Sequence, residues 1–226
     1  MTSKPSFIHE RNVVIKDTVR KFGLIFPSTY SIGMGGMTVA VLSEIVNRLK
    51  NWQFERFFIP WSPFVESRSI EHDLSLSQVD VIGFTAQFEV TYLALGWFLK
   101  KAGIPIDNLK RKKEKGKYPL VIIGGPCSYA NPFPLIDIAD GFFIGDSENS
   151  LPLFLQQIEN SESIFWNDIN KFQDVPGFWS PHFLDLREKE KYSELFKDKS
   201  FEEVAGEWHS RAEFVNLNEV TYPLKQ

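Results

Sequence analysis

A short apolar run that breaks into two glycines is the strongest constraint on how this chain can fold. Leu120 to Ile123 are four aliphatic residues, and Gly124 and Gly125 follow at once. A short run without polar residues is typical of a strand buried on both faces, as in a parallel sheet. Ligands bind at the carboxyl edge of such sheets, and a glycine pair there lets a ligand approach the backbone without meeting a Cβ. A side chain added at Gly125 is therefore expected to obstruct a ligand.

Segments of this kind alternate with helical patterns along the chain. The expected strands are residues 22–27, 54–60, 79–85, 120–123 and 141–144. Between them apolar residues recur at helical spacing, as at Met37, Val41, Ile45 and Leu49, at Val90, Leu93, Ala94, Trp97 and Phe98, and at Leu151, Phe154, Leu155 and Ile158. Alternating strands and helices require parallel crossovers. The sequence therefore predicts an α/β fold, a doubly wound and mainly parallel five-stranded sheet of the Rossmann or flavodoxin-like type, with an irregular C-terminal extension.

The predicted sheet occupies only part of the chain. We expect an N-terminal extension over residues 1–19, an α/β domain over 20–163, and a C-terminal extension or linker over 164–226. From about residue 165 the sequence is aromatic, rich in proline and charged. Between Arg187 and Glu203 charged residues dominate, and neither a helical stripe nor a strand alternation is visible. Trp52, Trp61, Trp97 and Phe98 are expected to pack in the core or at a domain interface.

Composition excludes several classes of protein. A chain of 226 residues with 43% hydrophobic and 24% charged residues can bury one domain with structure attached to it. A net charge of −4 attracts neither nucleic acid nor anionic lipid, so neither is expected as a partner. The basic run Lys110 to Lys117 is interpreted as a solvated loop rather than a phosphate-binding patch. The single cysteine excludes an internal disulfide and favours a reducing cytoplasm. No apolar run approaches the roughly 20 residues of a bilayer span, and no membrane association is expected.

Four loops are expected to meet at the carboxyl edge of the sheet. The candidate binding residues in them are Ser28, Thr29, Tyr30, Gly33, Thr85, Gln87, Gly124, Gly125, Pro126, Gly145, Asp146 and Glu148. Hydroxyls, an amide and free N–H groups at helix N-termini suit a large polar ligand that carries phosphate. Any single glycine could instead only form a tight turn. Asp146 and Glu148 could equally complement the dipole of the following helix.

Neither a catalytic nor a metal-ligating residue is expected. Cys127 is a weak candidate nucleophile, because a catalytic thiol needs a base beside it. The four histidines, His9, His72, His182 and His209, all lie outside the four loops. The loop Gly33 to Gly36 has neither the spacing of a dinucleotide-binding motif nor the lysine of a phosphate loop.

Taken in order, these segments resemble the cobalamin-binding-type domain that precedes the catalytic barrel in a large group of radical SAM proteins. The matching segments are 26–34, 57–61, 80–89, 103–105, 124–127 with 131–132, and 140–148, and a weaker match continues through 175–177. The set is similar above all to an uncharacterised radical SAM subgroup. The resemblance implies that cobalamin lies across the carboxyl edge of the sheet, with its nucleotide tail entering beside Gly124 and Gly125.

Two departures from the family pattern limit what the resemblance implies. Tyr30 stands where cobalamin domains often carry the histidine of D-x-H-x-x-G, and a phenol is a poor cobalt ligand at neutral pH. Cobalamin bound here would therefore lack a protein histidine ligand. The C-x-x-x-C-x-x-C motif is also missing, and its three thiolates hold the iron–sulfur cluster that cleaves S-adenosylmethionine. The chain is expected to be an accessory domain, a fragment that lacks the catalytic barrel, and not to be catalytic alone. The cluster and S-adenosylmethionine are expected on a radical SAM catalytic domain, in cis or in trans.

Two other interpretations stay open. The chain could be a degenerate, non-catalytic α/β module that no longer binds cobalamin and serves interdomain or protein–protein contact. Tyr30 and the aromatic segment Pro176 to Phe183 favour that alternative. A flavodoxin-like or nucleotide-binding domain is a third interpretation, which follows from the fold alone.

Overall fold

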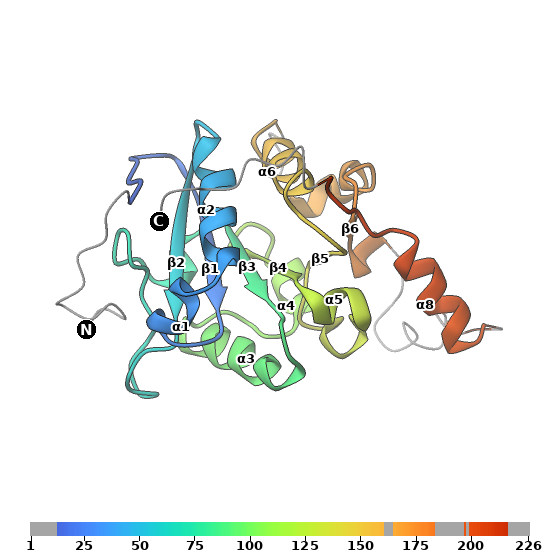
Figure 1. The fold of residues 1–226 in the computed structure, drawn as a ribbon, viewed down its shortest axis with the longest axis horizontal. Helices are drawn as coiled ribbons and strands as arrows, with labels where there is room; N and C mark the ends of the chain where they lie inside the picture. The colour runs from blue at the N-terminus through green and yellow to red at the C-terminus, as the bar shows by residue number, and fades with distance from the viewer. Residues whose placement is uncertain (1–12, 161–164, 184–196, 198, 217–226) are drawn as a thin grey trace.

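A six-stranded sheet forms the centre of the protein in the computed structural model, which describes residues 13–160, 165–183, 197 and 199–216 (Figure 1). The strands are β1 (Arg20–Phe26), β2 (Trp52–Phe58), β3 (Val81–Thr85), β4 (Leu120–Gly124), β5 (Gly141–Phe143) and β6 (Phe178–Trp179), in the order β2-β1-β3-β4-β5-β6. The first five are parallel, which confirms the predicted sheet. β6 adds an antiparallel strand, since Phe142 pairs with Trp179 and Phe143 with Phe178. Two residues are too few to show an alternation in sequence.

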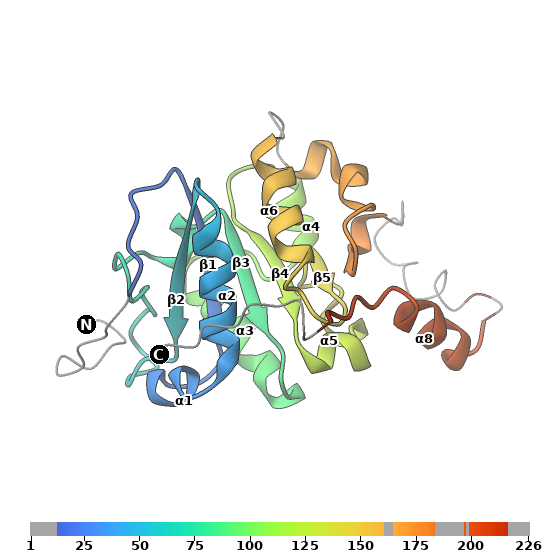
Figure 2. The same ribbon diagram turned by 45° about the horizontal axis from the view of Figure 1, so that its top comes forward.

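Helices cover both faces of the sheet, as a doubly wound fold requires (Figure 2). They are α1 (Tyr30–Met34), α2 (Met37–Arg48), α3 (Tyr92–Lys101), α4 (Asn108–Lys113), α5 (Pro126–Ala130), α6 (Ser150–Asn160) and α8 (Phe201–His209). The 3-10 turns are η1 (Leu76–Gln78), η2 (Glu89–Thr91), η3 (Phe133–Leu135), η4 (Phe165–Asn167), η5 (Ile169–Phe172) and η6 (Pro181–Phe183). α2 and α6 pack on one face, and buried residues of both helices belong to one core cluster. α3, α5 and Trp208 of α8 contribute to a second cluster on the opposite face.

The connection from β2 to β3, which the structure describes throughout, contains no long helix and covers the outer edge of the sheet at β2. β2 is an edge strand, yet all of its residues are buried. The Ile70 N–H donates to the Arg56 carbonyl at 3.0 Å, so the connection occupies part of the strand's free hydrogen-bonding edge. Arg56 also forms an ion pair with Glu71. Burial raises the pKa of the Glu71 carboxyl, and the charge of Arg56 opposes that shift in part.

Several side chains lie on a different face than their spacing predicted. Leu93 is 82% exposed, and the buried side of α3 is formed by Leu95, Phe98 and Leu99. Trp61 is 83% exposed and does not belong to the core, whereas Trp52 is fully buried. Trp61 follows β2 directly, in a loop at the carboxyl edge of the sheet.

The basic run from Lys110 to Lys117 is not simply a solvated loop. Its first part lies in α4, and Arg111 is buried there. Arg111 Nη2 lies 2.8 Å from Asp140 Oδ1, and its Nη1 donates to the Pro105 carbonyl at 2.6 Å. This residue therefore joins α4 to the start of β5.

Part of the predicted C-terminal extension belongs to the packed structure. Four of its residues are buried in the core cluster to which α2 and α6 contribute, namely Trp166, Phe172, Val175 and Phe178. α8 begins in a segment where the sequence shows no helical stripe. The sequence feature that marks its start is the capping box formed by Ser200 and Glu203. Most of the charged segment between Arg187 and Glu203, and residues 1–12 of the N-terminal extension, lie outside the described residues.

Candidate functional site

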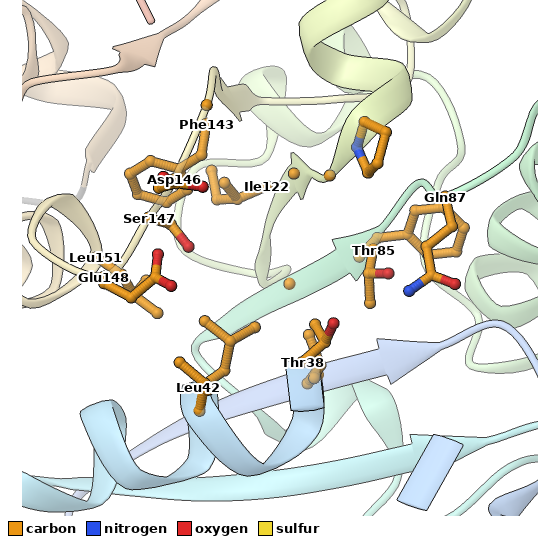
Figure 3. A pocket seen from close by; sticks show the side chains of 18 of the residues that line it. Thr38, Leu42, Thr85, Gln87, Ile122, Phe143, Asp146, Ser147, Glu148 and Leu151 are labelled. Carbon is orange, nitrogen blue, oxygen red and sulfur yellow. The ribbon is translucent and has the colours of Figure 1, made fainter. Parts of the chain in front are cut away.

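The strand order creates a switch point at the carboxyl edge, between β1 and β3. The chain leaves β1 through α2 toward β2, and it leaves β3 through α3 toward β4. α2 and α3 contribute to core clusters on opposite faces, so the face above β3 and β4 on the α2 side receives no helix from the β3–β4 connection. Ligands of doubly wound folds bind at such a position. A cavity of about 500 Å³ lies there (Figure 3).

The cavity has an apolar floor and two unlike walls. The floor is formed by residues of the sheet, namely Phe22, Leu24, Gly83, Ile122 and Phe143. One wall is formed by Met37, Thr38, Val41 and Leu42 of α2, and the other by Gly145, Asp146, Ser147, Glu148 and Leu151. The lining is completed at the strand ends by Phe84, Thr85, Gln87, Gly124, Gly125 and Pro126. Figure 3 shows the apolar Leu42 on the side of α2 and the carboxylates of Asp146 and Glu148 across from it.

The two consecutive glycines have different roles. A Cβ at Gly124 would meet only the Phe143 Cβ, at 3.8 Å, so a side chain there would extend into space that the cavity now occupies. Gly125 has a φ of +102°, and a Cβ there would lie 3.0 Å from the Ala86 carbonyl oxygen. The Cys127 N–H donates to that same carbonyl. Gly124 therefore opens the cavity, and Gly125 forms the turn that holds the ends of β3 and β4 together.

Polar groups in the lining are few, and the charged ones are both carboxylates. Thr85 is buried, and its Oγ1 has no hydrogen-bond partner among the described residues. Asp146 and Glu148 contribute carboxylates, and none of the described residues that line the cavity is basic. A buried hydroxyl without a partner is costly unless a ligand or water satisfies it. The lining thus suits a ligand part with apolar surface and hydrogen-bond donors, and a phosphate is better accommodated outside it.

The structure brings together eight of the twelve sequence-predicted site residues. Thr85, Gln87, Gly124, Gly125, Pro126, Gly145, Asp146 and Glu148 line the cavity, whereas Ser28, Thr29, Tyr30 and Gly33 do not. Tyr30 is buried with its ring centroid 5.4 Å from that of Phe58. A Cβ at Gly33 would lie 2.3 Å from the Phe58 ring, so these two residues of α1 pack onto β2.

The wall formed by α2 was missed by the sequence analysis. Thr38, Val41 and Leu42 lie on the helix that the apolar stripe assigned to the core. A threonine beside that stripe is a weak signal, because surface helices commonly carry one. Ser147 and Leu151 were missed as well, although they adjoin predicted residues.

Cys127 and His209 lie outside the lining of the cavity. Cys127 is buried in the core cluster that contains α3, and its thiol interacts with the Tyr92 hydroxyl. Burial raises the pKa of Tyr92, and Cys127 adds to the shift. His209 Nε2 lies 3.1 Å from the Tyr129 carbonyl oxygen, so this histidine does contact α5, the helix that follows the glycine pair.

The described residues offer neither a metal-binding cluster nor a membrane span. They contain no group of three or more His, Cys, Asp or Glu side chains arranged to hold a metal ion. No helix in the part of the chain that the structure describes combines the length and the apolar character needed to cross a bilayer.

Comparison with known proteins gives one family match and two individual ones. A family described as the N-terminal region of radical SAM proteins matches residues 38–181. An uncharacterised protein of Methanocaldococcus jannaschii is 21% identical over 181 residues, which are 80% of this chain and 32% of that protein. The chain therefore spans about a third of that relative's length. The cobalamin-dependent S-adenosylmethionine radical enzyme OxsB, solved with aqua-cobalamin and S-adenosylmethionine bound, is 15% identical with a TM-score of 0.45, over 70% of this chain and 20% of that one.

Proposed function

This chain belongs to the family of radical SAM N-terminal domains, and from that premise we propose that it is the cobalamin-binding-type accessory domain of a radical SAM protein. The observation that carries the proposal is the cavity beside Gly124, at the switch point of the sheet. Part of the cofactor would enter this cavity, and the rest would lie across the carboxyl edge. When bound, cobalamin would supply radical or group-transfer chemistry to a catalytic domain.

The lining fits the organic part of such a cofactor. Asp146 and Glu148 can accept hydrogen bonds from the amide side chains of a corrin, and Thr85 Oγ1 is a buried group that still needs a partner. The apolar floor at Ile122 and Phe143 suits a flat ring. These residues would hold the cofactor by contact and hydrogen bonding.

The same lining does not offer a histidine ligand to cobalt. The residue at the expected histidine position is Tyr30, and it packs on Phe58 outside the cavity. No histidine is among the described residues that line the cavity. Cobalamin would accordingly bind without a histidine from this site.

The remaining parts of a radical SAM enzyme would come from another domain, in cis or in trans. One cysteine cannot supply the three thiolates of the iron–sulfur cluster, so the cluster and S-adenosylmethionine would be bound elsewhere. Exposed apolar side chains follow successive strands at the carboxyl edge, namely Ile32, Met37, Trp61, Phe64, Phe88, Val90 and Leu93. Such a surface favours contact with a second domain there. A cytoplasmic setting for this assembly remains part of the proposal.

A second candidate function is an α/β module that contacts other domains without a cofactor. Tyr30 in place of a histidine removes a cobalt ligand, and the exposed apolar side chains at the carboxyl edge are consistent with protein contact there, so both favour this function. In that case the cavity would be a remnant.

Titration of the purified chain with hydroxocobalamin, flavin mononucleotide and S-adenosylmethionine separates these functions. Absorbance reports the two coloured ligands, and calorimetry reports all three. Saturable binding of hydroxocobalamin alone is expected. Binding of flavin mononucleotide alone would favour a flavodoxin-like domain, and no binding of any of the three would favour the contact module.

A further inference from the structure

The C-terminal part of the described chain backs the carboxylate wall of the cavity. α8 lies beyond α5 at one end of the molecule, and the chain after α8 turns back toward β5 (Figure 2). We call residues 208–215 the strap. The strap contacts two segments next to the cavity, the loop after β5 and the helix α5 after the glycine pair.

The first contact extends the sheet beyond the end of β5. The Glu213 N–H donates to the Ile144 carbonyl at 3.0 Å, and the Asp146 N–H donates to the Glu213 carbonyl at 2.7 Å. The Val215 N–H then donates to Asp146 Oδ2 at 3.2 Å. Residues on both sides of Gly145 are thus tied to the strap, and Asp146 is held through its backbone and its side chain.

The close approach at this contact depends on Gly145. Its φ is +87°, and a Cβ there would lie 2.1 Å from the Glu213 carbonyl oxygen. Only a glycine allows the strap this near to the cavity wall. The glycine that the sequence suggested as a ligand contact therefore also receives the strap.

The second contact fixes α5. Trp208 is buried, and its Nε1 donates to the Ser128 carbonyl at 2.9 Å. Its ring lies 4.9 Å from that of Trp179 and 5.8 Å from that of Phe142. His209 stacks on Tyr129 with ring centroids 4.6 Å apart. The strap therefore joins β5, β6 and α5 around the end of the cavity that carries Asp146.

We infer that the strap positions the cavity wall formed by Gly145 to Glu148, and that Glu213 is the positioning residue through which it does so. The inference rests on the proposed function in naming cobalamin as the ligand. An attached strap holds the carboxylates of the wall in one arrangement before the ligand arrives, which lowers the ordering cost of binding. By linkage, a ligand that favours the attached strap stabilises the strap by the same factor.

A matched pair of substitutions isolates this effect from packing. Glu213→Pro removes the N–H that bonds to Ile144, while Glu213→Ala keeps it and removes only the side chain. Gly206→Ala in α8 is a further control, because a Cβ there would meet nothing within 4 Å. Two readouts are used: the affinity for hydroxocobalamin and the hydrogen exchange of a peptide containing residues 145–148.

Glu213→Pro should weaken hydroxocobalamin binding about five- to tenfold, the equivalent of one backbone hydrogen bond, and should speed exchange at Asp146. Gly206→Ala should stay within about twofold of the parent, and Glu213→Ala should bind hydroxocobalamin more tightly than Glu213→Pro does. Hydroxocobalamin should slow exchange at Asp146 in the parent protein. Equal affinities for Glu213→Pro and Glu213→Ala would overturn the inference.

The exchange measurement separates failure of the strap from failure of the proposed function. A parent protein that binds no hydroxocobalamin contradicts the proposed function. The strap is then decided by exchange alone: faster exchange at residues 145–148 in Glu213→Pro than in Glu213→Ala supports it, and equal rates refute it.

Discussion

At the scale of single residues, the carboxyl edge separates positions that shape the cavity from positions that shape the backbone. Gly124 is the last residue of β4 and does not have a positive φ, and a side chain there would point into the cavity. Gly125 has a positive φ and touches Ala86, so a substitution there strains the turn whatever ligand is bound. Gly124 is therefore the sharper test of ligand approach than Gly125, although the sequence alone favoured Gly125.

Gly124→Val should reduce hydroxocobalamin affinity at least about tenfold, because its methyl groups would occupy the cavity. The melting temperature should change little, since the nearest atom to the new Cβ is 3.8 Å away. Absorbance titration and circular dichroism of the same sample measure both. Gly124→Ala is the milder control, and undiminished affinity in folded Gly124→Val would show that the ligand does not enter here.

Thr85→Val tests whether the buried hydroxyl serves a ligand. Its Oγ1 has no partner in the described structure, so replacing it with a methyl group should leave the free protein equally stable or stabilise it by up to about 1 kcal/mol. Hydroxocobalamin affinity should fall several-fold at the same time. Thermal denaturation with and without ligand measures the two effects, and a loss of stability in the free protein would indicate a structural hydroxyl instead.

At the scale of elements, α8 depends on the capping box at its start. The Ser200 N–H donates to Glu203 Oε2 at 2.7 Å, and the Glu203 N–H donates to Ser200 Oγ at 3.2 Å. The hydrogen bond from the Ser200 backbone is the main reason why the pKa of the Glu203 carboxyl lies below its ordinary value of 4.5. The hydrogen bond with the Ser200 side chain lowers this pKa further. The helix that carries Trp208 is therefore supported by one ionised carboxylate.

That lowered pKa makes the stability of α8 depend on pH in acid. The ionised form contributes its full stabilisation above the unfolded-state pKa of 4.5, and the contribution is lost as pH falls through the lower folded-state pKa. Hydrogen exchange in α8 should therefore accelerate below about pH 4.5 relative to the rest of the chain. Glu203→Gln should remove that dependence, and an identical acid response in parent and variant would contradict it.

At the scale of the whole molecule, a buried ion pair and the cavity lie at opposite edges of the sheet. Asp140 precedes β5 at the amino edge and is fully buried; its Oδ2 accepts the Val121 N–H at 2.7 Å and Arg111 Nε at 3.1 Å. One carboxylate thus joins β4, β5 and α4. The cavity lies at the carboxyl edge of the same strands.

Asp140→Asn should therefore destabilise the fold without changing the site. Leaving the buried Arg111 without its ionised partner should cost about 3 kcal/mol and lower the melting temperature by roughly 10 °C. Hydroxocobalamin affinity of the folded protein, measured well below that temperature, should remain as in the parent. A large loss of affinity would mean that the two edges are coupled.

The sequence alone was sufficient for the five parallel strands and for eight of the twenty residues that line the cavity. Apolar runs such as Leu120 to Ile123 identify buried strands locally, and glycines such as Gly124 mark where these strands end. Loops that follow parallel strands must lie at one edge, so the order of strands and loops along the chain already groups Thr85, Gly124 and Asp146. Their use by a ligand stays a prediction.

Tertiary structure decided which of these residues face one another. The spacing of residues in the sequence does not specify which strands are neighbours or which helix covers which face of the sheet. The observed strand order and helix placement leave β3 and β4 uncovered beside Leu42 of α2. The same arrangement buried Tyr30 against Phe58 and exposed Leu93, because a stripe is buried only where another element packs on it. The pairing of Glu213 with Gly145 joins residues far apart in the chain, and such long-range contacts leave no periodic pattern in the sequence that could announce them.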